Sequence, residues 1–282
     1  MSIKTIGVIG SGIMGSGIAE AAAGHDFKVI LRSRSISNAE SMKATMEKSL
    51  AKQVEKEKIT EDKKQQTLSN VKLTEDLNDL SDCDLIIESI VEDLDAKIEL
   101  FRQLDSIAKK EAILATNTST LPVVEMAIET SRPDHICGIH FFNPAPVMKL
   151  VEVVRPITAS QETIDQALEF ARTCEKEPVV VKDQAGFIVN ALLFPYLNNA
   201  IRLAEQGVAS YEDIDLAMKG GCGFPMGPFA LLDLVGLDTS LAILDALYDE
   251  FKDPNFAAVP LLRRMVAANK LGRKTKQGFY TY

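Results

Sequence analysis

The sequence predicts an α/β protein in two parts: a mostly parallel sheet covered by helices over residues 1–184, then an all-α part over residues 185–282. Three observations predict this fold class. Short apolar runs rich in β-branched residues alternate with helical stretches through the first part. A long polar helical insertion follows the second strand at residues 38–69. After residue 182 only helical periodicity remains.

The predicted strands are continuous apolar runs, as expected of strands buried on both faces of a parallel sheet. They cover residues 6–9, 28–31, 85–87, 112–115, 135–142, 150–154 and 178–181. The second part is predicted to begin with a long helix that Pro195 kinks. Its later helices are expected at residues 211–219, 230–234, 240–251 and 260–269.

Length and composition indicate an ordinary globular protein, since 282 residues with 46% apolar side chains can bury a full core. The net charge of -9 repels polyphosphates, so nucleic acid is not an expected partner. No apolar run is long enough to span a membrane, and the first ten residues lack the parts of a signal peptide. We therefore expect no membrane partner and a cytoplasmic location, or a mature form without its targeting segment. The four cysteines stand far apart without a neighbouring histidine, so no metal site is predicted.

A glycine motif directly follows the first strand and opens a helix. Gly10 permits a tight turn, Gly12 lets the backbone approach a pyrophosphate, and Gly15 lets helix and strand pack closely. The helix N-terminus at Ile13 and Met14 adds N–H donors and the positive end of a dipole. Glycines also end strands for purely structural reasons. The strand before and the helix after favour a Rossmann-type dinucleotide-binding domain.

The chain has three histidines, so each can be weighed as a general base. His25 lies in a helix-end turn and is expected at the surface. His135 begins the strand that His140 ends, and ligands bind at the carboxyl ends of parallel strands. His140 is therefore the candidate base. The alternative is a buried structural histidine that bonds to the backbone.

Glu152 is a lone acid in the apolar strand at residues 150–154. A carboxylate there needs a partner, and His140 on a neighbouring strand would supply one. Such a pairing would fix the tautomer of the imidazole and raise its basicity. The alternative is a structural ion pair of Glu152 with Arg155 or Lys149.

Five motifs lie along the chain: ATNTS at residues 115–119, HFFNPAPVMKLVE at 140–152, GFIVN at 186–190, PMGPF at 225–229 and LGRK at 271–274. With them the whole chain resembles the 3-hydroxyacyl-CoA dehydrogenases, most closely the short bacterial 3-hydroxybutyryl-CoA dehydrogenases. The resemblance implies an NAD(P)-dependent oxidoreductase that interconverts (S)-3-hydroxyacyl-CoA, expected to be 3-hydroxybutyryl-CoA, and 3-oxoacyl-CoA such as acetoacetyl-CoA. It also implies a catalytic tetrad of Ser119, His140, Glu152 and Asn190.

The chemistry of that reaction accounts for these residue types. In the reducing direction a hydride reaches C3 while the carbonyl oxygen gains negative charge, so this oxygen needs a proton donor and fixed hydrogen-bond donors. His140 is expected to supply the proton, and Ser119 and Asn190 the neutral donors. From the residues alone, the alternatives are that Ser119 is a turn or helix-capping residue and that Asn190 is a polar helix position.

By the same resemblance Glu92, Lys97, Asn143 and Lys274 line the cofactor site, together with Ser119. These polar residues are expected to be exposed. The alternative to a cofactor contact is therefore that they are ordinary surface residues. Residues 82–88 follow the pattern that the family shows at its fourth strand. The alternative is that Glu88 only ends this strand.

The second strand ends without the acid that an NAD-preferring site needs to bind the adenosine ribose. Ser33 stands where that acid is expected, and no acid occurs between Asp26 and Glu40. Arg34 beside it can present a guanidinium fork to a 2′-phosphate. We therefore expect a preference for NADP(H), with NAD(H) as a possible cofactor. The alternative is a polar loop whose arginines face water.

The polyphosphate tail of CoA needs a local basic site. Ser49, Lys52 and Lys56 fall on one face of the helical insertion. The resemblance implies CoA contacts at Ser49 and Lys56. A solvated helix face balanced by nearby glutamates is the alternative.

The sequence leaves two other functions as alternatives. The short 3-hydroxyacid dehydrogenases share the glycine start and the helical second domain, but they use a lysine on the long helix, and residues 185–206 contain none. A non-catalytic, crystallin-like or sensor-like relative is the other alternative, which an intact tetrad disfavours. Apolar residues at 229–237 and 241–251 exceed what a small helical domain is expected to hide, so we predict a homodimer formed through it.

Overall fold

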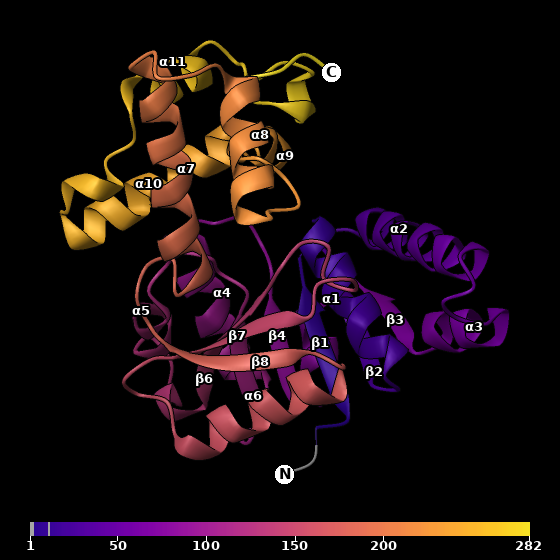
Figure 1. Cartoon of the computed structure of the whole chain (residues 1–282). Helices are drawn as coiled ribbons and strands as arrows, with labels where there is room; N and C mark the ends of the chain where they lie inside the picture. Colours follow the sequence, from indigo (N-terminus) through magenta and orange to yellow (C-terminus); the bar gives the residue numbers. More distant parts are fainter. Residues whose placement is uncertain (1–2, 11) are drawn as a thin grey trace. The chain divides into compact units, whose positions relative to one another are not determined.

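The computed structural model describes residues 3–10 and 12–282 of the chain (Figure 1). They form two compact units, Met1–Asp183 and Gln184–Tyr282. The first unit is α/β with a mostly parallel sheet and the second is all-α, which confirms the predicted fold class. None of the helices in the described part of the chain combines the length and apolar character that crossing a membrane requires.

Eight strands of the described chain form one sheet in the order β3-β2-β1-β4-β5-β6-β7-β8. β6 and β7 are antiparallel, and all other neighbouring pairs are parallel. The strands are β1 (Thr5–Ile9), β2 (Lys28–Arg32), β3 (Val71–Thr74), β4 (Leu85–Glu88), β5 (Ile113–Thr116), β6 (Ile136–Phe141), β7 (Leu150–Arg155) and β8 (Glu177–Lys182). The apolar runs located all of these strands except β3, a short one in which Lys72 interrupts the apolar pattern.

Helices cover the sheet. In the first unit they are α1 (Ile13–Gly24), α2 (Ile36–Glu55), α3 (Glu61–Ser69), α4 (Leu94–Ile107), α5 (Val123–Ala127) and α6 (Gln161–Thr173). The core lies where α1 and α6 pack on the sheet: Ile18 and Phe170 join strand residues such as Leu31 and Ile139 in one buried apolar cluster. Burying each such side chain contributes roughly 1.5–3 kcal/mol.

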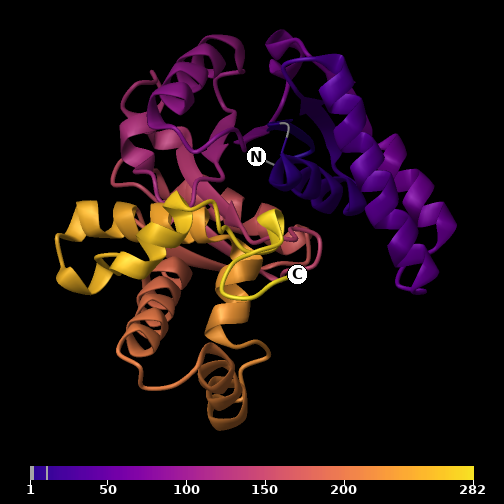
Figure 2. The same ribbon diagram turned by 90° about the horizontal axis from the view of Figure 1, so that it is seen from above.

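The predicted helical insertion is a pair of helices, α2 and α3, both of which pack on α1. In Figures 1 and 2 the pair, drawn in violet, lies along one side of the first unit. Glu57 adopts a left-handed conformation with φ of +55° just after α2 ends. The Thr60 side chain then caps α3 by accepting a hydrogen bond from the N–H of Lys63, at 3.1 Å.

The parallel strands bring three chain segments to one edge of the sheet. Ile9 in β1 is level with Glu88 in β4, and Glu88 is level with Thr116 in β5. These residues are the last of their strands, so the loops that follow them all leave the carboxyl edge. Ligands bind at this edge in open α/β sheets.

The second unit contains α7 (Val189–Glu205), α8 (Tyr211–Cys222), α9 (Pro228–Val235), α10 (Leu237–Phe251) and α11 (Pro260–Ala267). α7 continues through Pro195. The core of the second unit is one apolar cluster to which α7, α9 and α10 contribute residues such as Phe194, Phe229 and Leu244.

The apolar segments on which the dimer prediction rests are partly buried within the second unit. About half of the large apolar side chains at 229–237 and 241–251, including Leu232, Leu237 and Leu247, are buried. Leu234, Tyr248 and Phe251 are exposed, and Leu231 and Leu241 are half-buried. The periodicity shows that a helix has an apolar face, but it does not show how much of that face its own unit covers.

Candidate active site

His140 and Glu152 form a buried pair on neighbouring strands. They are directly opposite each other in the antiparallel ladder of β6 and β7, so both side chains leave the same face of the sheet. Nδ1 of His140 lies 2.8 Å from Oε2 of Glu152. Because a carboxylate only accepts, this contact assigns the proton to Nδ1 and leaves Nε2 of a neutral imidazole as the acceptor.

The two alternative partners of Glu152 are engaged elsewhere. The Lys149 ammonium donates to the backbone carbonyl of Glu175, at 3.4 Å. The guanidinium of Arg155 donates to the side-chain amide oxygen of Gln161. The strand alternation therefore directs Glu152 toward the histidine, as predicted, rather than toward either basic neighbour.

Ser119 completes this geometry from the loop that follows β5. Its Oγ lies 3.1 Å from Nε2 of His140. The side chain of Asn117 ties the same loop to β6, because its Oδ1 accepts a hydrogen bond from the N–H of Phe141 at 2.8 Å. The arrangement is a hydroxyl, an imidazole and a carboxylate in hydrogen-bonding order, which can move a proton to or from an oxygen placed beside Ser119.

The helix cap expected of Ser119 as an alternative is supplied by another residue. Asp183 accepts hydrogen bonds from the N–H groups of Val123 and Val124, at 2.9 and 2.7 Å, where α5 begins. Ser119 itself turns toward His140.

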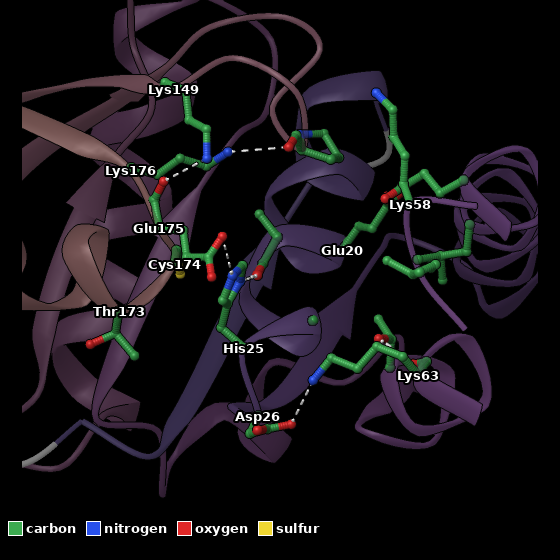
Figure 3. Close-up of a pocket in the computed structure, with 17 residues that line it drawn as sticks. Glu20, His25, Asp26, Lys58, Lys63, Lys149, Thr173, Cys174, Glu175 and Lys176 are labelled. Carbon is green, nitrogen blue, oxygen red and sulfur yellow. Dashed lines mark hydrogen bonds and ion pairs between the residues drawn. The ribbon is translucent and has the colours of Figure 1, made fainter. Parts of the chain in front are cut away.

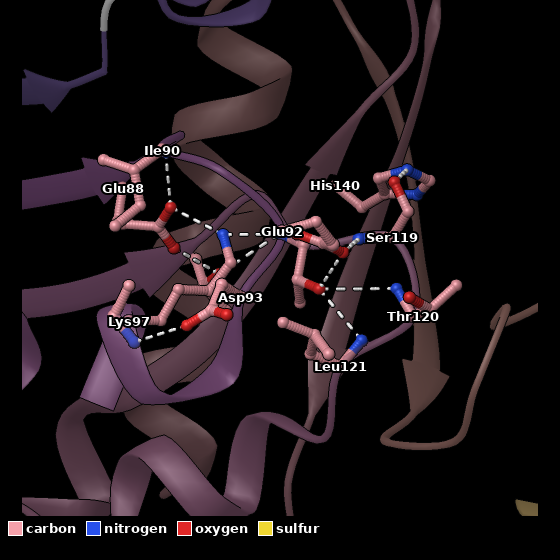
Figure 4. A network of polar contacts seen from close by, with 12 residues as sticks. Glu88, Ile90, Glu92, Asp93, Lys97, Ser119, Thr120, Leu121 and His140 are labelled. Atoms are coloured by element: carbon pink, nitrogen blue, oxygen red, sulfur yellow. Dashed lines mark hydrogen bonds and ion pairs between the residues drawn. The ribbon is translucent and has the colours of Figure 1, made fainter. Parts of the chain in front are cut away.

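A network of polar contacts continues from Ser119 to the neighbouring loop (Figure 4). Oε1 of Glu92 accepts hydrogen bonds from the backbone N–H of Ser119 (2.8 Å) and the hydroxyl of Thr118 (2.5 Å). Lys97 pairs with Glu88 at 2.6 Å and with Glu92 at 3.3 Å. The expected exposure of Lys97 is therefore wrong. Its side chain is 1% exposed because two carboxylates at the edge of the sheet enclose the ammonium group.

Three other predicted residues lie apart from this network. Asn143 is exposed in the loop between β6 and β7. In the second unit, Asn190 is a buried residue in the first turn of α7, and Lys274 forms an ion pair with Asp238. The participation of these three residues stays a prediction.

The glycine loop after β1 has the backbone that the motif predicts. Gly10 has φ of +142°, and a Cβ on it would lie 2.1 Å from the Ser89 carbonyl oxygen. A Cβ on Gly15 would lie 2.7 Å from the carbonyl oxygen of Gly10. A Cβ on Gly12 would meet nothing within 4 Å, so Gly12 faces open space at the N-terminus of α1. Ser11 lies outside the described residues.

A cavity of about 270 Å³ adjoins this loop and is lined by Gly10, Gly12, Arg32, Ser33 and Arg34, among others. Ser33 is 2% exposed, and its Oγ has no hydrogen-bond partner in the part of the chain that the structure describes. Burial and the neighbouring positive charge of Arg34 lower the pKa of Arg32. An unpartnered buried hydroxyl and two cations beside a glycine loop fit the adenosine end of a dinucleotide.

A second, larger cavity of about 590 Å³ is lined by Glu20, Lys58 and Lys149, among others, but not by the predicted CoA residues Ser49 and Lys56 (Figure 3). Ser49 turns inward from α2 and donates to Oε1 of Glu20 at 3.0 Å, while Lys56 is exposed just after α2. The ammonium groups of Lys58 and Lys149 belong to the cavity lining. Burial raises the pKa of Glu20, which also lines the cavity, to about 7.

Comparisons with known proteins show the family to which the chain belongs. Residues 5–184 match the family model described as 3-hydroxyacyl-CoA dehydrogenase, NAD binding domain. Residues 186–282 match the model described as 3-hydroxyacyl-CoA dehydrogenase, C-terminal domain. The chain belongs to the 3-hydroxyacyl-CoA dehydrogenase family. It is accordingly an oxidoreductase with a nicotinamide-dinucleotide-binding domain.

The similarity to individual family members extends over the whole chain. A 3-hydroxybutyryl-CoA dehydrogenase from Clostridioides difficile is 49% identical over 98% of this chain and 99% of its own length. The mitochondrial hydroxyacyl-coenzyme A dehydrogenase of Sus scrofa is 46% identical over 99% of this chain and 91% of its own length. The crystal structure of (S)-3-hydroxybutyryl-CoA dehydrogenase from Ralstonia eutropha superposes with a TM-score of 0.97, at 42% identity, covering 100% and 99% of the two chains.

Two buried residues near the site, Glu88 and Lys176, were not predicted to contribute to it. Glu88 was expected only as part of the family's fourth-strand pattern or as the end of the strand, yet it is a buried acceptor of Lys97. Its position at the end of an apolar strand was the signal. Lys176 was not considered, although its ammonium donates to the carbonyl oxygens of Ala145 (2.7 Å) and Met148 (2.9 Å) in the loop after β6. No sequence pattern predicts such a long-range contact with the backbone.

Proposed function

We propose that the chain interconverts (S)-3-hydroxyacyl-CoA and 3-oxoacyl-CoA, with 3-hydroxybutyryl-CoA and acetoacetyl-CoA as the preferred pair and NADP(H) as the preferred cofactor. The observation that carries the proposal is the chain of contacts from Ser119 Oγ through His140 to Glu152. It supplies the proton transfer that an alcohol–ketone interconversion requires.

His140 acts as the general acid and base. In the oxidising direction Nε2 takes the proton of the 3-hydroxyl group, and Glu152 stabilises the imidazolium that forms. In the reducing direction the imidazolium returns that proton to the oxygen at C3. Ser119 and Asn190 donate hydrogen bonds to this oxygen as it gains charge. The chemistry that a nicotinamide supplies when bound is hydride donation or acceptance at C3 of the acyl group.

The first unit binds the dinucleotide. Gly10, Gly12 and Gly15, with Ile13 and Met14 at the start of α1, would hold the pyrophosphate. The further contacts are proposed for Ser119 and for Glu92, Lys97, Asn143 and Lys274.

The NADP(H) preference rests on the cavity beside Ser33. Burial and the charge of Arg34 lower the pKa of Arg32 there, and a 2′-phosphate would offset both effects while it gives the Ser33 hydroxyl a partner. Among the residues that the structure describes, no acid lines the cavity to repel the phosphate. NAD(H) would bind without these gains, so it is the weaker cofactor.

The CoA nucleotide binds along α2, at Ser49 and Lys56. The adjoining cavity supports this placement, because Lys58 and Lys149 add ammonium groups to its lining and its volume of about 590 Å³ is of the size that ligand sites have. Four lysines and three acids line this cavity, and its small excess of lysines is the local positive charge proposed to attract a polyphosphate to a chain of net charge -9.

We also propose that the second unit contributes to the substrate site and forms a homodimer, supported by the exposure of Leu216 and Phe224 on α8 and the residues after it. Light scattering at micromolar concentration tests the dimer, which a monomer would contradict. A cytoplasmic location is supported by four unpaired cysteines, the usual state in a reducing compartment.

The test of the proposed function is an absorbance assay of NADPH and NADH oxidation on addition of acetoacetyl-CoA, with free acetoacetate as the matched control. Turnover of the thioester alone supports the proposal. Turnover of free acetoacetate at a similar rate would favour a short 3-hydroxyacid dehydrogenase. No turnover of either compound would favour a non-catalytic dinucleotide-binding protein.

A further inference from the structure

A buried carboxylate that takes no part in the proposed proton transfer lies at the end of β4. Glu88 is fully buried. It accepts hydrogen bonds from the Lys97 ammonium (2.6 Å), the N–H of Ile90 (2.6 Å) and the hydroxyl of Thr116 (2.7 Å). Burying a carboxylate is costly unless such donors compensate for the lost water. Three donors from three chain segments therefore hold Glu88 in one place.

One path leads from Glu88 to Ser119 through two charged residues (Figure 4). The Lys97 ammonium bridges Glu88 and Glu92, with N–O distances of 2.6 and 3.3 Å. The other carboxylate oxygen of Glu92 accepts the backbone N–H of Ser119, at 2.8 Å. The position of Glu92, and with it that of the Ser119 backbone, therefore depends on where Lys97 is held.

A second path leads to the same loop through hydroxyl groups. Thr116 donates to Oε2 of Glu88 and accepts the backbone N–H of Thr118 at 3.2 Å. The hydroxyl of Thr118 in turn donates to Glu92 at 2.5 Å. Both paths begin at Glu88 and converge on the residues next to Ser119.

We propose that Glu88 is a positioning residue for the reaction. Through Lys97 and Thr116 it fixes the loop at 117–119, so that the Ser119 hydroxyl stays within 3.1 Å of Nε2 of His140. The inference rests on the proposed function, in which Ser119 and His140 act on the oxygen at C3. A preorganised donor is effective only at the position where charge develops, and a displacement of about 1 Å can cost roughly 10²-fold in rate.

The variant that tests the proposal is Glu88→Gln, which keeps the shape of the side chain and removes its charge. Glu92 is then the remaining carboxylate beside the buried Lys97 ammonium, and the stronger pull of this cation draws Glu92 away from the N–H of Ser119. We expect kcat to fall by roughly 10- to 100-fold. The KM for acetoacetyl-CoA is expected to stay unchanged, because the CoA contacts lie elsewhere.

A double-mutant cycle with Ser119→Ala distinguishes positioning from general structural support. If Glu88 acts through the Ser119 hydroxyl, Glu88→Gln lowers kcat by no more than about twofold once that hydroxyl is absent. If Glu88 merely supports the edge of the sheet, the loss is equally large in both backgrounds. That result, or an unchanged kcat in the single variant, overturns the inference and leaves the proposed function intact.

Thr116→Val takes the place of Glu88→Gln in the same cycle if the charge change prevents folding. It removes one of the two paths while the Glu88–Lys97 pair stays in place, so we expect a smaller loss of kcat that again disappears in Ser119→Ala. Thr130→Val is the matched control, because the Thr130 hydroxyl bonds to the carbonyl oxygen of Ala127 at 2.8 Å, outside this network. Absence of turnover in the unmodified chain would overturn the proposed function and this inference with it.

Discussion

His140 and Glu152 face each other across β6 and β7, the one antiparallel strand pair in the described sheet, with 2.8 Å between Nδ1 and Oε2. The reversal of direction at β7 is what allows a base at the end of one strand to meet an acid near the start of the next. Both side chains are buried, so the pair is held without competition from water.

Replacing the acid of this pair should disable the base. Glu152→Gln retains the size of the side chain but loses the charge that stabilises the imidazolium, so we expect kcat to fall by roughly 10²-fold or more. Combining it with His140→Ala should cost little beyond His140→Ala alone, because the two residues act as one unit. Steady-state rates of the single and double variants test this. Losses that multiply would mean that Glu152 is only structural.

Cofactor preference should depend on the cavity beside β2. The double substitution Ser33→Asp with Arg34→Ile places a carboxylate next to the 2′-phosphate and removes a guanidinium partner, so kcat/KM for NADPH should fall while that for NADH is spared. The unmodified chain should prefer NADPH. A clear preference for NADH in the unmodified chain would mean that the arginines serve no phosphate site.

The CoA site should respond to charge on α2 and to the nucleotide of the substrate. Lys56→Glu is expected to raise the KM for acetoacetyl-CoA and leave kcat nearly unchanged, since it removes binding that ground state and transition state share. Acetoacetyl-pantetheine, which lacks the nucleotide, should show no such change. Lys110→Glu, an exposed lysine after α4, provides the matched charge control. An unchanged KM in Lys56→Glu would place the nucleotide elsewhere.

Stability should depend on pH through Glu20. Burial raises the pKa of this carboxyl from the ordinary 4.5 to about 7, so the folded chain holds a proton that the unfolded chain has lost between these values. The free energy of unfolding therefore decreases as pH rises from 4.5 to 7, by roughly 3 kcal/mol in total at about 1.4 kcal/mol for each pH unit. Glu20→Gln should abolish this decrease while it keeps an acceptor for Ser49.

Urea unfolding of both forms at several pH values measures the Glu20 effect. The variant and the unmodified chain should be about equally stable near pH 4.5, and the variant should be the more stable at pH 8. A difference that does not grow with pH would show that Glu20 is ionised in the folded chain throughout this range.

Much of the fold could be predicted from the sequence because its signals are local. Continuous apolar runs such as those of β1 and β4 indicate strands buried on both faces, and the glycine spacing after β1 indicates the turn at Gly10. The pairing of His140 with Glu152 was also predictable, since a lone acid in an apolar strand needs a partner. β3 and the break after α2 carried weaker signals, because a short strand and a left-handed residue such as Glu57 have no distinctive pattern.

The burial of charged residues could not be predicted in the same way. A lysine on a helix is ordinarily exposed. Lys97 is buried because the carboxylates of Glu88 in β4 and Glu92 in the preceding loop compensate for the water that its ammonium loses. How much of the apolar face of α10 is buried could not be predicted either. Segments of the chain that are distant in sequence decide what covers that face. Periodicity reports a residue's neighbours along the chain, whereas burial depends on neighbours in space.

The central claim is that His140 performs the acid–base step of a hydride transfer to acetoacetyl-CoA. The most direct measurement is kcat for NADPH oxidation by acetoacetyl-CoA in the unmodified chain and in His140→Ala, with cofactor binding and circular dichroism recorded for both. We predict that the variant folds and binds the cofactor, and that its kcat is lower by about 10²–10⁴-fold. An unchanged kcat in a folded His140→Ala variant would contradict the account.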